Sequence, residues 1–453
     1  MRPELSGALF VFCERIPFLR FLQLDNLRRK GFSEGKKIKK RERNEEIGAQ
    51  IKKIKFKMSK KLTIGLFGYG VVGTGLYDVL HKSKTVDATI KKIVVKHKDK
   101  PRNISQEHFH YDKNEILQDE EINLVVELID DADAAFEIVK TALEKGKAVV
   151  SANKKMIAEH FEELYELQKK HQVPFLYEAA VCGSIPIIRN LEEYYNNDFL
   201  QSIQGIVNGS TNYILTKTFQ DNLSYEEALK EAQEKGYAES NPILDTGGFD
   251  ARSKLQILLT HSFGITTKPE EVFNVGIQNL GDLEIKYAKE KKLQIKLLAY
   301  AQKRNEEEVI ALVIPKFVKS TDTFSTVSDV FNGVKVQTAF ADKQFFYGRG
   351  AGSLPTASAV LSDISAIAYD YRYEYKKIAN SENLKLAQDF PLKVLFRHKA
   401  KDSQNFENYF EEIEEFYGNR EDAYFVGSIR FQQLKDVFTK HQDEVSFVLI
   451  DIL

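Results

Sequence analysis

The sequence contains little cysteine, no tryptophan and no long apolar run. Its two cysteines, Cys13 and Cys182, are too few for a disulfide framework or a cysteine zinc site, so a reducing, cytoplasmic location fits best. No stretch reaches the roughly 18 consecutive apolar residues that a membrane-spanning helix needs. The formal net charge is −1, which gives no reason to expect nucleic acid or an acidic membrane as a partner. Together these absences argue against a secreted, membrane-embedded or nucleic-acid-binding protein.

The chain is nevertheless long enough for two or three domains, with 453 residues of which 43% are hydrophobic. Residues 1–57 differ from the rest, because an apolar patch at 9–12 is followed by a basic stretch, 28–57, without hydrophobic periodicity. This order is the reverse of a secretory signal. A nucleic-acid-binding arm is one interpretation of the basic stretch. We predict instead an unstructured extension, with the functional protein beginning at Met58.

A glycine-rich turn follows the first buried-strand pattern, at 62–67, and precedes a helical pattern at 74–81. The turn is a G-x-G-x-x-G motif in the strand–turn–helix context that gives it mechanical meaning. The first glycine makes the turn, the second lets a pyrophosphate approach, and the third lets helix and strand pack closely. Unpaired N–H groups at the helix N-terminus then face the phosphates. We therefore predict a dinucleotide site formed by Gly68, Tyr69, Gly70, Val71, Val72 and Gly73.

Basic residues follow the next predicted strand, 93–95. Domains of this kind that bind NAD hold the ribose 2′-hydroxyl with an acid near this position, whereas basic side chains suit the 2′-phosphate of NADP. Lys96 and Arg102 are the candidate contacts, so NADP(H) is favoured and NAD(H) stays open. A solvated basic loop explains the same two residues equally well.

Further strand patterns extend an α/β fold, at 124–129, 147–150 and 175–178. Ligands of such sheets bind beyond the carboxyl ends of the strands. Ser151 and Lys154 follow the second of these strands, so Ser151 is a candidate cofactor contact. A lysine at this position is either a surface residue or part of an active site.

The segment 236–254 concentrates charged side chains between glycine-based turns. Asp250 and Lys254 are four residues apart, so on a helix both side chains share one face, which suits a proton-transfer lysine positioned by a carboxylate. An exposed ion pair at a helix start is the commoner meaning of this spacing. Glu239 and Asp245 shift the balance, because acids held in such turns often line a site.

Read from Ala232, the same segment matches A-x-x-x-G-Y-x-E-x-[DN]-P-x-x-D-x-x-G-x-D-x-x-x-K, the signature of homoserine dehydrogenases. Supporting matches lie at 68–73, 152–154, 208–213 and 350–357. The chain resembles this family from Lys61 to about Lys376. The resemblance implies reversible NAD(P)H-dependent reduction of L-aspartate 4-semialdehyde to L-homoserine, in threonine and methionine biosynthesis. It also implies a homodimer or homotetramer.

The resemblance further implies roles for individual residues. Lys254 and Lys154 would be paired lysines at the reacting oxygen, oriented by Asp250. Repulsion between two ammonium groups would lower a lysine pKa and ease proton donation, and the same charge would stabilise a developing alkoxide. The nicotinamide would supply the hydride. Substrate binding would fall to Glu239, Asp245, Tyr237, Lys154, Gly209 and Ser210.

Two further sites come from the resemblance. A monovalent cation such as Na⁺ or K⁺ would be bound by Glu178, Val181, Gly183 and Ile185. Gly352 would approach the cofactor from the C-terminal segment. Three positions depart from the family pattern: acids at 130–131 replace two glycines, Ser210 replaces a threonine, and Thr246 replaces an aliphatic residue.

These observations predict an α/β fold with a Rossmann-type dinucleotide-binding domain, an α+β substrate and dimerisation domain, and a small C-terminal α+β module. The predicted boundaries are 58–187 (completed by 346–380), 188–345 and 381–453. The β-branched run 309–314, followed by Pro315, fits a strand buried on both faces, with a buried helix segment as the alternative.

In the C-terminal module, strands are predicted at 392–396 and 445–451, with helices at 405–416 and 431–440. Many members of the family carry an ACT regulatory domain here, which would bind threonine and opens with a strand and an Asp-x-Pro-Gly turn. The sequence has Arg-His-Lys-Ala at 397–400 instead. We therefore predict an ACT-like module at most, and threonine feedback stays open.

Two other functions compete with this assignment. A semialdehyde dehydrogenase would need a cysteine nucleophile, for which Cys182 is the candidate, and a reactive thiolate needs an activating base or cation nearby. Cys182 fits better as a small residue in a tight turn. A non-catalytic nucleotide-sensing regulator would need neither paired lysines nor clustered acids.

Overall fold

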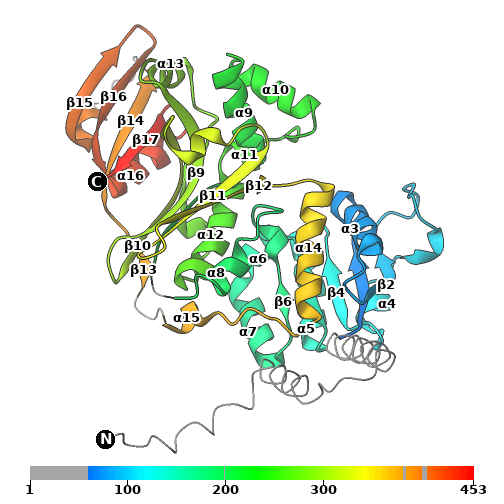
Figure 1. Ribbon diagram of the computed structural model, residues 1–453. Helices are drawn as coiled ribbons and strands as arrows, with labels where there is room; N and C mark the ends of the chain where they lie inside the picture. Colours follow the sequence, from blue (N-terminus) through cyan, green and yellow to red (C-terminus); the bar gives the residue numbers. More distant parts are fainter. Residues whose placement is uncertain (1–59, 198, 381–383, 400–405) are drawn as a thin grey trace, which may run out of the picture. The chain divides into compact units, whose positions relative to one another are not determined.

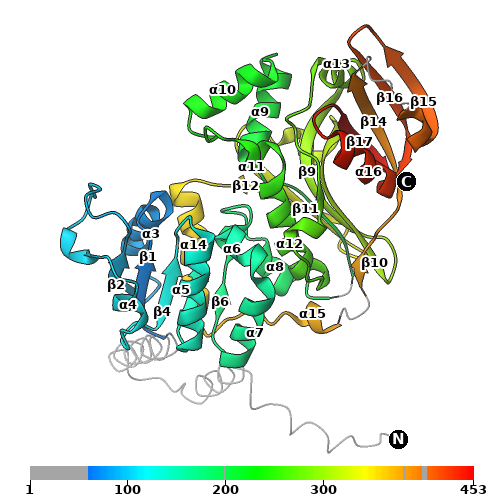
Figure 2. The ribbon, with the colours of Figure 1, turned by 180° about the vertical axis from the view of Figure 1, so that it is seen from behind.

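The computed structural model describes residues 60–197, 199–380, 384–399 and 406–453. The predicted extension 1–57 and Met58 lie outside the described residues, and the predicted domain boundaries stay a prediction. The described chain is organised around two sheets, which Figure 1 and Figure 2 show from opposite sides.

The first sheet has six strands within the described residues, in the order β3-β2-β1-β4-β5-β6, and all its neighbours are parallel. Its strands are β1 Leu62–Phe67, β2 Ala88–Val94, β3 Phe109–His110, β4 Leu124–Glu127, β5 Ala148–Ser151 and β6 Phe175–Leu176. The strand order reverses between β1 and β4, which is the switch point where such sheets bind ligands. The predicted Rossmann-type architecture is confirmed.

Helices cover both faces of this sheet, as the right-handed crossovers of a parallel sheet require. They are α3 Val71–Lys82, α4 Asn114–Leu117, α5 Ala132–Glu144, α6 Lys154–Glu159, α7 Phe161–His171 and α14 Ser353–Ile367. The helix α14 comes from much later in the chain and packs against α3, so the C-terminal segment completes this part of the fold (Figure 1). The hydroxyl of Ser353 donates to the Val71 carbonyl oxygen at 2.8 Å.

The second sheet has eleven strands within the described residues, ordered β12-β11-β7-β9-β10-β17-β14-β16-β15, with β8 and β13 also paired to β10. The bounds are β7 Leu200–Ile206, β8 Phe273–Asn274, β9 Leu293–Lys303, β10 Glu308–Lys319, β11 Phe331–Thr338, β12 Lys343–Arg349, β13 Lys385–Leu386, β14 Pro391–Lys399, β15 Phe410–Gly418, β16 Asp422–Arg430 and β17 Ser446–Ile452. The helices of this part are α8 Ile188–Glu192, α9 Gly209–Gln220, α10 Tyr225–Glu234, α11 Ile243–Thr246, α12 Phe249–Phe263, α13 Asp282–Glu290, α15 Lys376–Asn380 and α16 Phe431–His441. Of these, α9, α12 and α13 contact the central strand β9.

Pro315 does not end the strand that the β-branched run predicted, because β10 continues to Lys319. The carbonyl oxygens of Val309 and Val313 accept hydrogen bonds from Ala387 and Val275, on the side away from β9. Alternate residues of a strand point their backbone groups to the same side. The missing N–H of Pro315 therefore falls on that side, where short strands pair only in places, and the ladder to β9 stays complete.

The predicted helix at 405–416 is wrong, since its described part forms the strand β15 after a short 3₁₀ turn. Phe410, Ile413 and Phe416 recur every three residues in this strand. Two register shifts against β16 each add one residue to β15, so these three side chains share one face of the strand. The rings of Phe410 and Phe416 both contact Phe425 of β16. The glutamates of β15 keep this edge strand charged, which discourages pairing with other chains.

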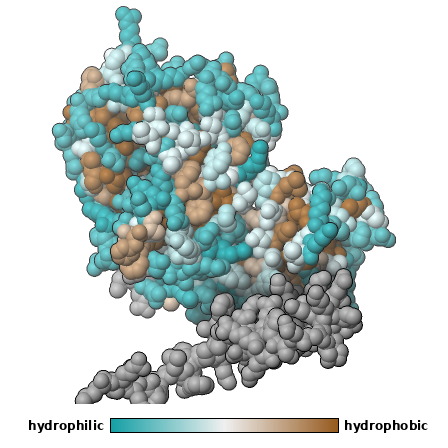
Figure 3. All heavy atoms as spheres, in the orientation of Figure 1, coloured by the Kyte–Doolittle hydropathy of each residue, from teal (hydrophilic) through white to brown (hydrophobic). Residues whose placement is uncertain are grey.

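On the face shown in Figure 3, hydrophilic residues predominate, with smaller hydrophobic areas between them. None of the helices in the described ranges combines the length and the apolar character that crossing a membrane requires.

Candidate active site

The three glycines of the nucleotide loop have the distinct geometries that the motif predicts. Gly68 has a φ of +92°, and a Cβ there would lie 2.5 Å from the Leu128 carbonyl oxygen. A Cβ on Gly73 would lie 2.3 Å from the Gly68 carbonyl oxygen, so any side chain would push helix and strand apart. No described heavy atom lies within 4 Å of a Cβ built on Gly70, which leaves this position open to a ligand. The turn, the open approach and the close packing therefore occur in the expected order.

The side chains of the other predicted contacts in this loop differ in their exposure and direction. Tyr69 is buried, and its hydroxyl donates to Asn103 Oδ1 at 3.0 Å, so its side chain points into the fold. Val71 is 69% exposed at the first position of α3, whereas Val72 lines a cavity.

Lys96 and Arg102 both lie in the loop that follows β2, at the edge where the nucleotide loop begins. Lys96 is exposed. The Arg102 guanidinium donates to the carbonyl oxygens of Lys100 and His97, and it lies 4.6 Å above the Phe109 ring. The structure thus holds Arg102 in a defined place while leaving Lys96 free to reach solvent or a ligand.

A cavity of about 190 Å³ lies where the nucleotide-binding sheet meets Lys154 and Lys254. Its lining residues are Val72, Leu128, Ile129, Asp130, Ala152, Lys154, Ala179, Ala180, Lys254, Gly350, Ala351 and Thr356. Asp130, one of the two acids that replace family glycines, is therefore at the cavity wall. Gly352, with a φ of +120°, begins α14 directly after the lining residues 350–351.

Asp250 is the centre of the site. Its Oδ2 accepts hydrogen bonds from Lys254 Nζ at 2.7 Å and from Asn208 Nδ2 at 2.9 Å, and its Oδ1 lies 3.1 Å from Lys154 Nζ. Burial by itself would raise the pKa of Asp250, but the charges of the two lysines outweigh burial and hold that pKa below its usual range. The exposed-pair interpretation of Asp250 and Lys254 is wrong, because both residues are 9% exposed.

The expected lowering of a lysine pKa is not found at Lys154. The nearby charge of Asp250 raises the pKa of Lys154, against a smaller opposing effect of burial. The Lys154 side chain is 43% exposed, so it lies at the border of the cluster. The Lys254 ammonium has a second hydrogen-bond partner, because it also donates to the Val207 carbonyl oxygen at 2.7 Å.

Asn208 belongs to the cluster although the sequence assigned it no role. Its Nδ2 bridges Asp250 and Asp245, at 2.9 and 2.7 Å, while its Oδ1 accepts from the Thr211 N–H and caps α9. Burial raises the pKa of Asp245. The signal for Asn208 was present, because an asparagine between a strand and a helical Gly-Ser-Thr stretch is a typical N-cap.

The remaining predicted substrate residues lie further out. Glu239 is exposed. Within the described part of the chain, its side chain forms no hydrogen bond or ion pair with Asp250. Tyr237 is 43% exposed, with its ring packed edge-on against Tyr213. The Ser210 hydroxyl donates to the Tyr237 carbonyl oxygen, which connects α9 to the signature loop. A Cβ on Gly209 would lie 2.9 Å from the Val330 carbonyl oxygen.

The predicted cation loop is buried, and its carboxylate is already engaged. Glu178 Oε1 and Oε2 accept from the N–H groups of Ile188 and Arg189, each at 2.8 Å. Burial raises the pKa of Glu178 to about 7. Ile185 is buried, and Gly183 has a φ of +52°. The described residues contain no group of three or more His, Cys, Asp or Glu side chains that could hold a metal.

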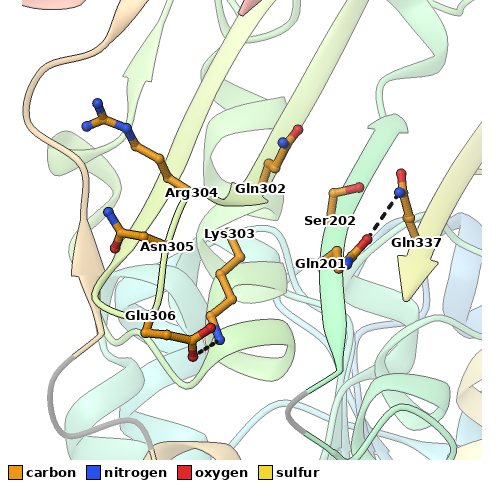
Figure 4. Close-up of a pocket in the computed structure, with 8 residues that line it drawn as sticks. All are labelled: Gln201, Ser202, Gln302, Lys303, Arg304, Asn305, Glu306 and Gln337. Atoms are coloured by element: carbon orange, nitrogen blue, oxygen red, sulfur yellow. Dashed lines mark hydrogen bonds and ion pairs between the residues drawn. The ribbon is translucent and has the colours of Figure 1, made fainter. Parts of the chain in front are cut away.

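A larger cavity, of about 330 Å³, lies elsewhere, at the ends of β7, β9 and β11 (Figure 4). It is polar and lined by Gln201, Ser202, Gln302, Lys303, Arg304, Asn305, Glu306 and Gln337. Lys303 and Glu306, three residues apart, form an ion pair on one side of it. It shares no lining residue with the cavity beside the lysines, so it plays no part in the site described here.

Comparisons with known proteins agree with this geometry. The model of the homoserine dehydrogenase NAD-binding domain matches residues 68–178, and the model of the homoserine dehydrogenase family matches residues 186–365. The homoserine dehydrogenase of Helicobacter pylori is 40% identical over 322 residues, which are 69% of this chain and 75% of that protein. The chain belongs to the homoserine dehydrogenase family. It is an NAD(P)-dependent oxidoreductase that interconverts L-aspartate 4-semialdehyde and L-homoserine.

Two further relatives cover more of the chain. The homoserine dehydrogenase of Bacillus subtilis is 32% identical over 410 residues, 86% of this chain and 91% of that protein. The crystal structure of a homoserine dehydrogenase from Thiobacillus denitrificans has a TM-score of 0.76 and 26% identity, covering 87% of this chain and 99% of that chain. The similarity therefore extends into the C-terminal strands.

Cys182 should be dispensable for activity. It is fully buried, and burial raises the pKa of its thiol to about 11, so the thiol stays protonated at neutral and mildly alkaline pH and is no nucleophile. We expect Cys182→Ala to keep the rate of semialdehyde-dependent NADPH oxidation within about twofold of the wild type. Treatment of the wild type with iodoacetamide at about pH 8 should leave the activity intact. Inactivation that Cys182→Ala prevents would contradict this.

Proposed function

We propose that Lys254 exchanges the proton with the reacting oxygen, that Lys154 lies beside it, and that Asp250 orients both ammonium groups. The observation that carries this proposal is the shared carboxylate, which holds the two lysines at 2.7 and 3.1 Å next to a cavity that both lysines line. A bound nicotinamide supplies the hydride. The ammonium groups stabilise negative charge developing on the aldehyde oxygen, and one of them then protonates it.

For the substrate we propose that the acids of the signature loop bind the α-ammonium group. Asp245 supports this because Asn208 holds its carboxylate next to Asp250. Glu239 and Tyr237 are exposed on the same loop, where their side chains can contact a bound substrate. Gly209 and Ser210 would contribute from the start of α9. Charge-assisted bonds of this kind separate homoserine from uncharged alcohols.

Replacing Lys254 should remove most of the activity. We expect Lys254→Ala to lower kcat for semialdehyde reduction by about 10²- to 10⁴-fold, because proton transfer and oxyanion stabilisation are both lost. Lys154→Ala should be impaired as well, whereas Asp245→Asn should mainly raise KM for the semialdehyde. The measurement is NADPH oxidation under saturating and limiting semialdehyde. Lys235→Ala, which removes an exposed lysine paired with Glu231, is the matched control. A kcat within about tenfold of wild type in Lys254→Ala would reject the assignment.

We further propose that the enzyme prefers NADP(H), with Lys96 and Arg102 at the ribose 2′-phosphate. The support is the placement of both basic residues in the loop after β2, with Arg102 fixed by its bonds to the loop backbone.

Loss of these two charges should therefore weaken NADPH selectively. We expect the double variant Lys96→Ala/Arg102→Ala to raise KM for NADPH about tenfold or more, with little change in KM for NADH, because only NADPH carries the extra phosphate. Lys82→Ala, at the far end of α3 from the nucleotide loop, controls for the general loss of positive charge. An equal change for both nucleotides would show that the loop is only a solvated basic surface.

A monovalent cation such as Na⁺ or K⁺, held by carbonyl oxygens of the 178–185 loop, is also proposed. The residues fit such an ion, because Asn332 is fully buried beside Cys182 of this loop, and among the described residues neither of its amide atoms has a hydrogen-bond partner of ordinary geometry. A Cβ on Gly183 would lie 2.5 Å from the Gly350 carbonyl oxygen, next to the Asn332 amide. The ion would add positive charge close to the cofactor cavity, where Gly350 is a lining residue.

The cation should stabilise the folded protein measurably. We expect NaCl or KCl to raise the melting temperature more than choline chloride does at equal ionic strength, because only the small ions fit a carbonyl cage. Gly183→Ala should abolish the difference. Identical melting curves in all three salts would reject the site. The homodimer or homotetramer implied by the resemblance stays a prediction, which sedimentation equilibrium would decide.

A further inference from the structure

Glu127 is a buried carboxyl group that the reaction described above does not use. It ends β4 and pairs in register with Ser151 at the end of β5, and both residues are completely buried. Residues that follow these two strand ends supply one wall of the 190 Å³ cavity: Leu128 to Asp130, Ala152 and Lys154. Glu127 therefore lies directly beneath the place where the nucleotide-binding sheet meets Lys154.

Four residues at these strand ends form a closed ring of hydrogen bonds. Glu127 Oε1 accepts from the Ile129 N–H at 2.7 Å, and Glu127 Oε2 accepts from the Ser151 hydroxyl at 2.5 Å. Ser151 Oγ accepts in turn from the Asn153 N–H at 3.0 Å. The side-chain Nδ2 of Asn153 closes the ring by donating to the Ile129 carbonyl oxygen at 3.0 Å.

The ring leads directly to Lys154. Asn153 Oδ1 accepts from the Met156 N–H at 3.0 Å and so caps α6, of which Lys154 is the first residue. From there the Lys154 ammonium reaches Asp250 on α12, at 3.1 Å. The direction in which α6 starts, and with it the position of this ammonium, is thus set by the bonds of Asn153 within the ring.

A carboxyl group is a costly way to fill this position. Burial raises the pKa of Glu127 to about 7, and within the described ranges no lysine, arginine or histidine forms an ion pair with it. An apolar side chain would avoid that cost, as it does at the neighbouring strand end, Phe67 of β1. An apolar side chain would, however, leave the Ile129 N–H and the Ser151 hydroxyl without the partner that Glu127 gives them. Groups with this combination of burial and perturbed protonation cluster at functional sites.

We propose that Glu127 is a positioning residue, which acts through Ser151 and Asn153 to hold Lys154 and the cavity wall at 128–130 in their reactive arrangement. The inference rests on the proposed role of Lys154. The Ser151 hydroxyl both donates and accepts inside the ring, so it serves this positioning and not a direct contact with the cofactor.

The test compares variants that keep the ring with variants that open it. Glu127→Gln retains the oxygen for Ile129, and its amide can donate to Ser151 Oγ, so we expect kcat within about threefold of wild type. Glu127→Met and Ser151→Ala open the ring from opposite sides. Each should lower kcat by about 10- to 100-fold through misplacement of Lys154, while the Kd of NADPH, from fluorescence titration, changes less than about threefold.

Two comparisons separate positioning from a structural role. Glu284→Gln neutralises another completely buried carboxyl group, on α13 next to Arg397, and should cost stability without lowering kcat per folded molecule. The double variant Lys154→Ala/Glu127→Met should be no slower than Lys154→Ala alone, because the two residues act through one ammonium.

Full kcat in folded Glu127→Met or Ser151→Ala, beside an impaired Lys154→Ala, would overturn the inference while leaving the role of Lys154 intact. A fully active Lys154→Ala would instead remove the lysine role on which the inference rests. A raised Kd for NADPH in Ser151→Ala, with kcat unchanged, would assign Ser151 to the cofactor and contradict the ring.

Discussion

The buried carboxylate of Asp250 is the group on which the arrangement of the site depends. A charge removed from water must find donors, and here each donor comes from a different part of the chain. Lys254 is one turn further along α12, Asn208 ends the loop between β7 and α9, and Lys154 begins α6 beyond the other sheet. Satisfying one carboxylate therefore requires that both sheets and three helices be in place. The requirement links folding directly to the assembly of this cluster.

The donors around Asp250 are themselves positioned by further hydrogen bonds. Lys154 can reach Asp250 only if α6 starts in the right direction, and its cap, Asn153, is held by the ring that includes Glu127. On the other side, Asn208 uses its oxygen to cap α9 and its nitrogen to bridge Asp245 and Asp250. Helix caps thus position the charged groups, because a cap fixes both the helix start and the side chain that makes it.

The sequence predicted those parts of the fold in which local chemistry and tertiary structure agree. The glycines of the nucleotide loop lie between a strand and a helix, and Asp250 and Lys254 lie within a long signature. These surroundings leave few other interpretations of either pattern. The strand β15 was predicted as a helix. Its two bulges place residues three apart on one strand face, and bulges depend on the partner strand and not on a local pattern. Glu127 gave no signal, since its role comes from Ser151, 24 residues away in the chain. Contacts of that kind are set by the sheet register and not by any local pattern.

The position of the carboxylate also affects the protonation of Lys154. The resemblance suggested that mutual repulsion would lower a lysine pKa, yet Asp250 raises the pKa of Lys154. Reduction of the aldehyde does not suffer from this, because a developing alkoxide is far more basic than any amine and takes the proton readily. Oxidation of homoserine passes through the same transition state in reverse, so the charge that Asp250 maintains on Lys154 stabilises the alkoxide in both directions. On the proposed assignment the interaction that assembles the site therefore also keeps a positive charge beside the reacting oxygen.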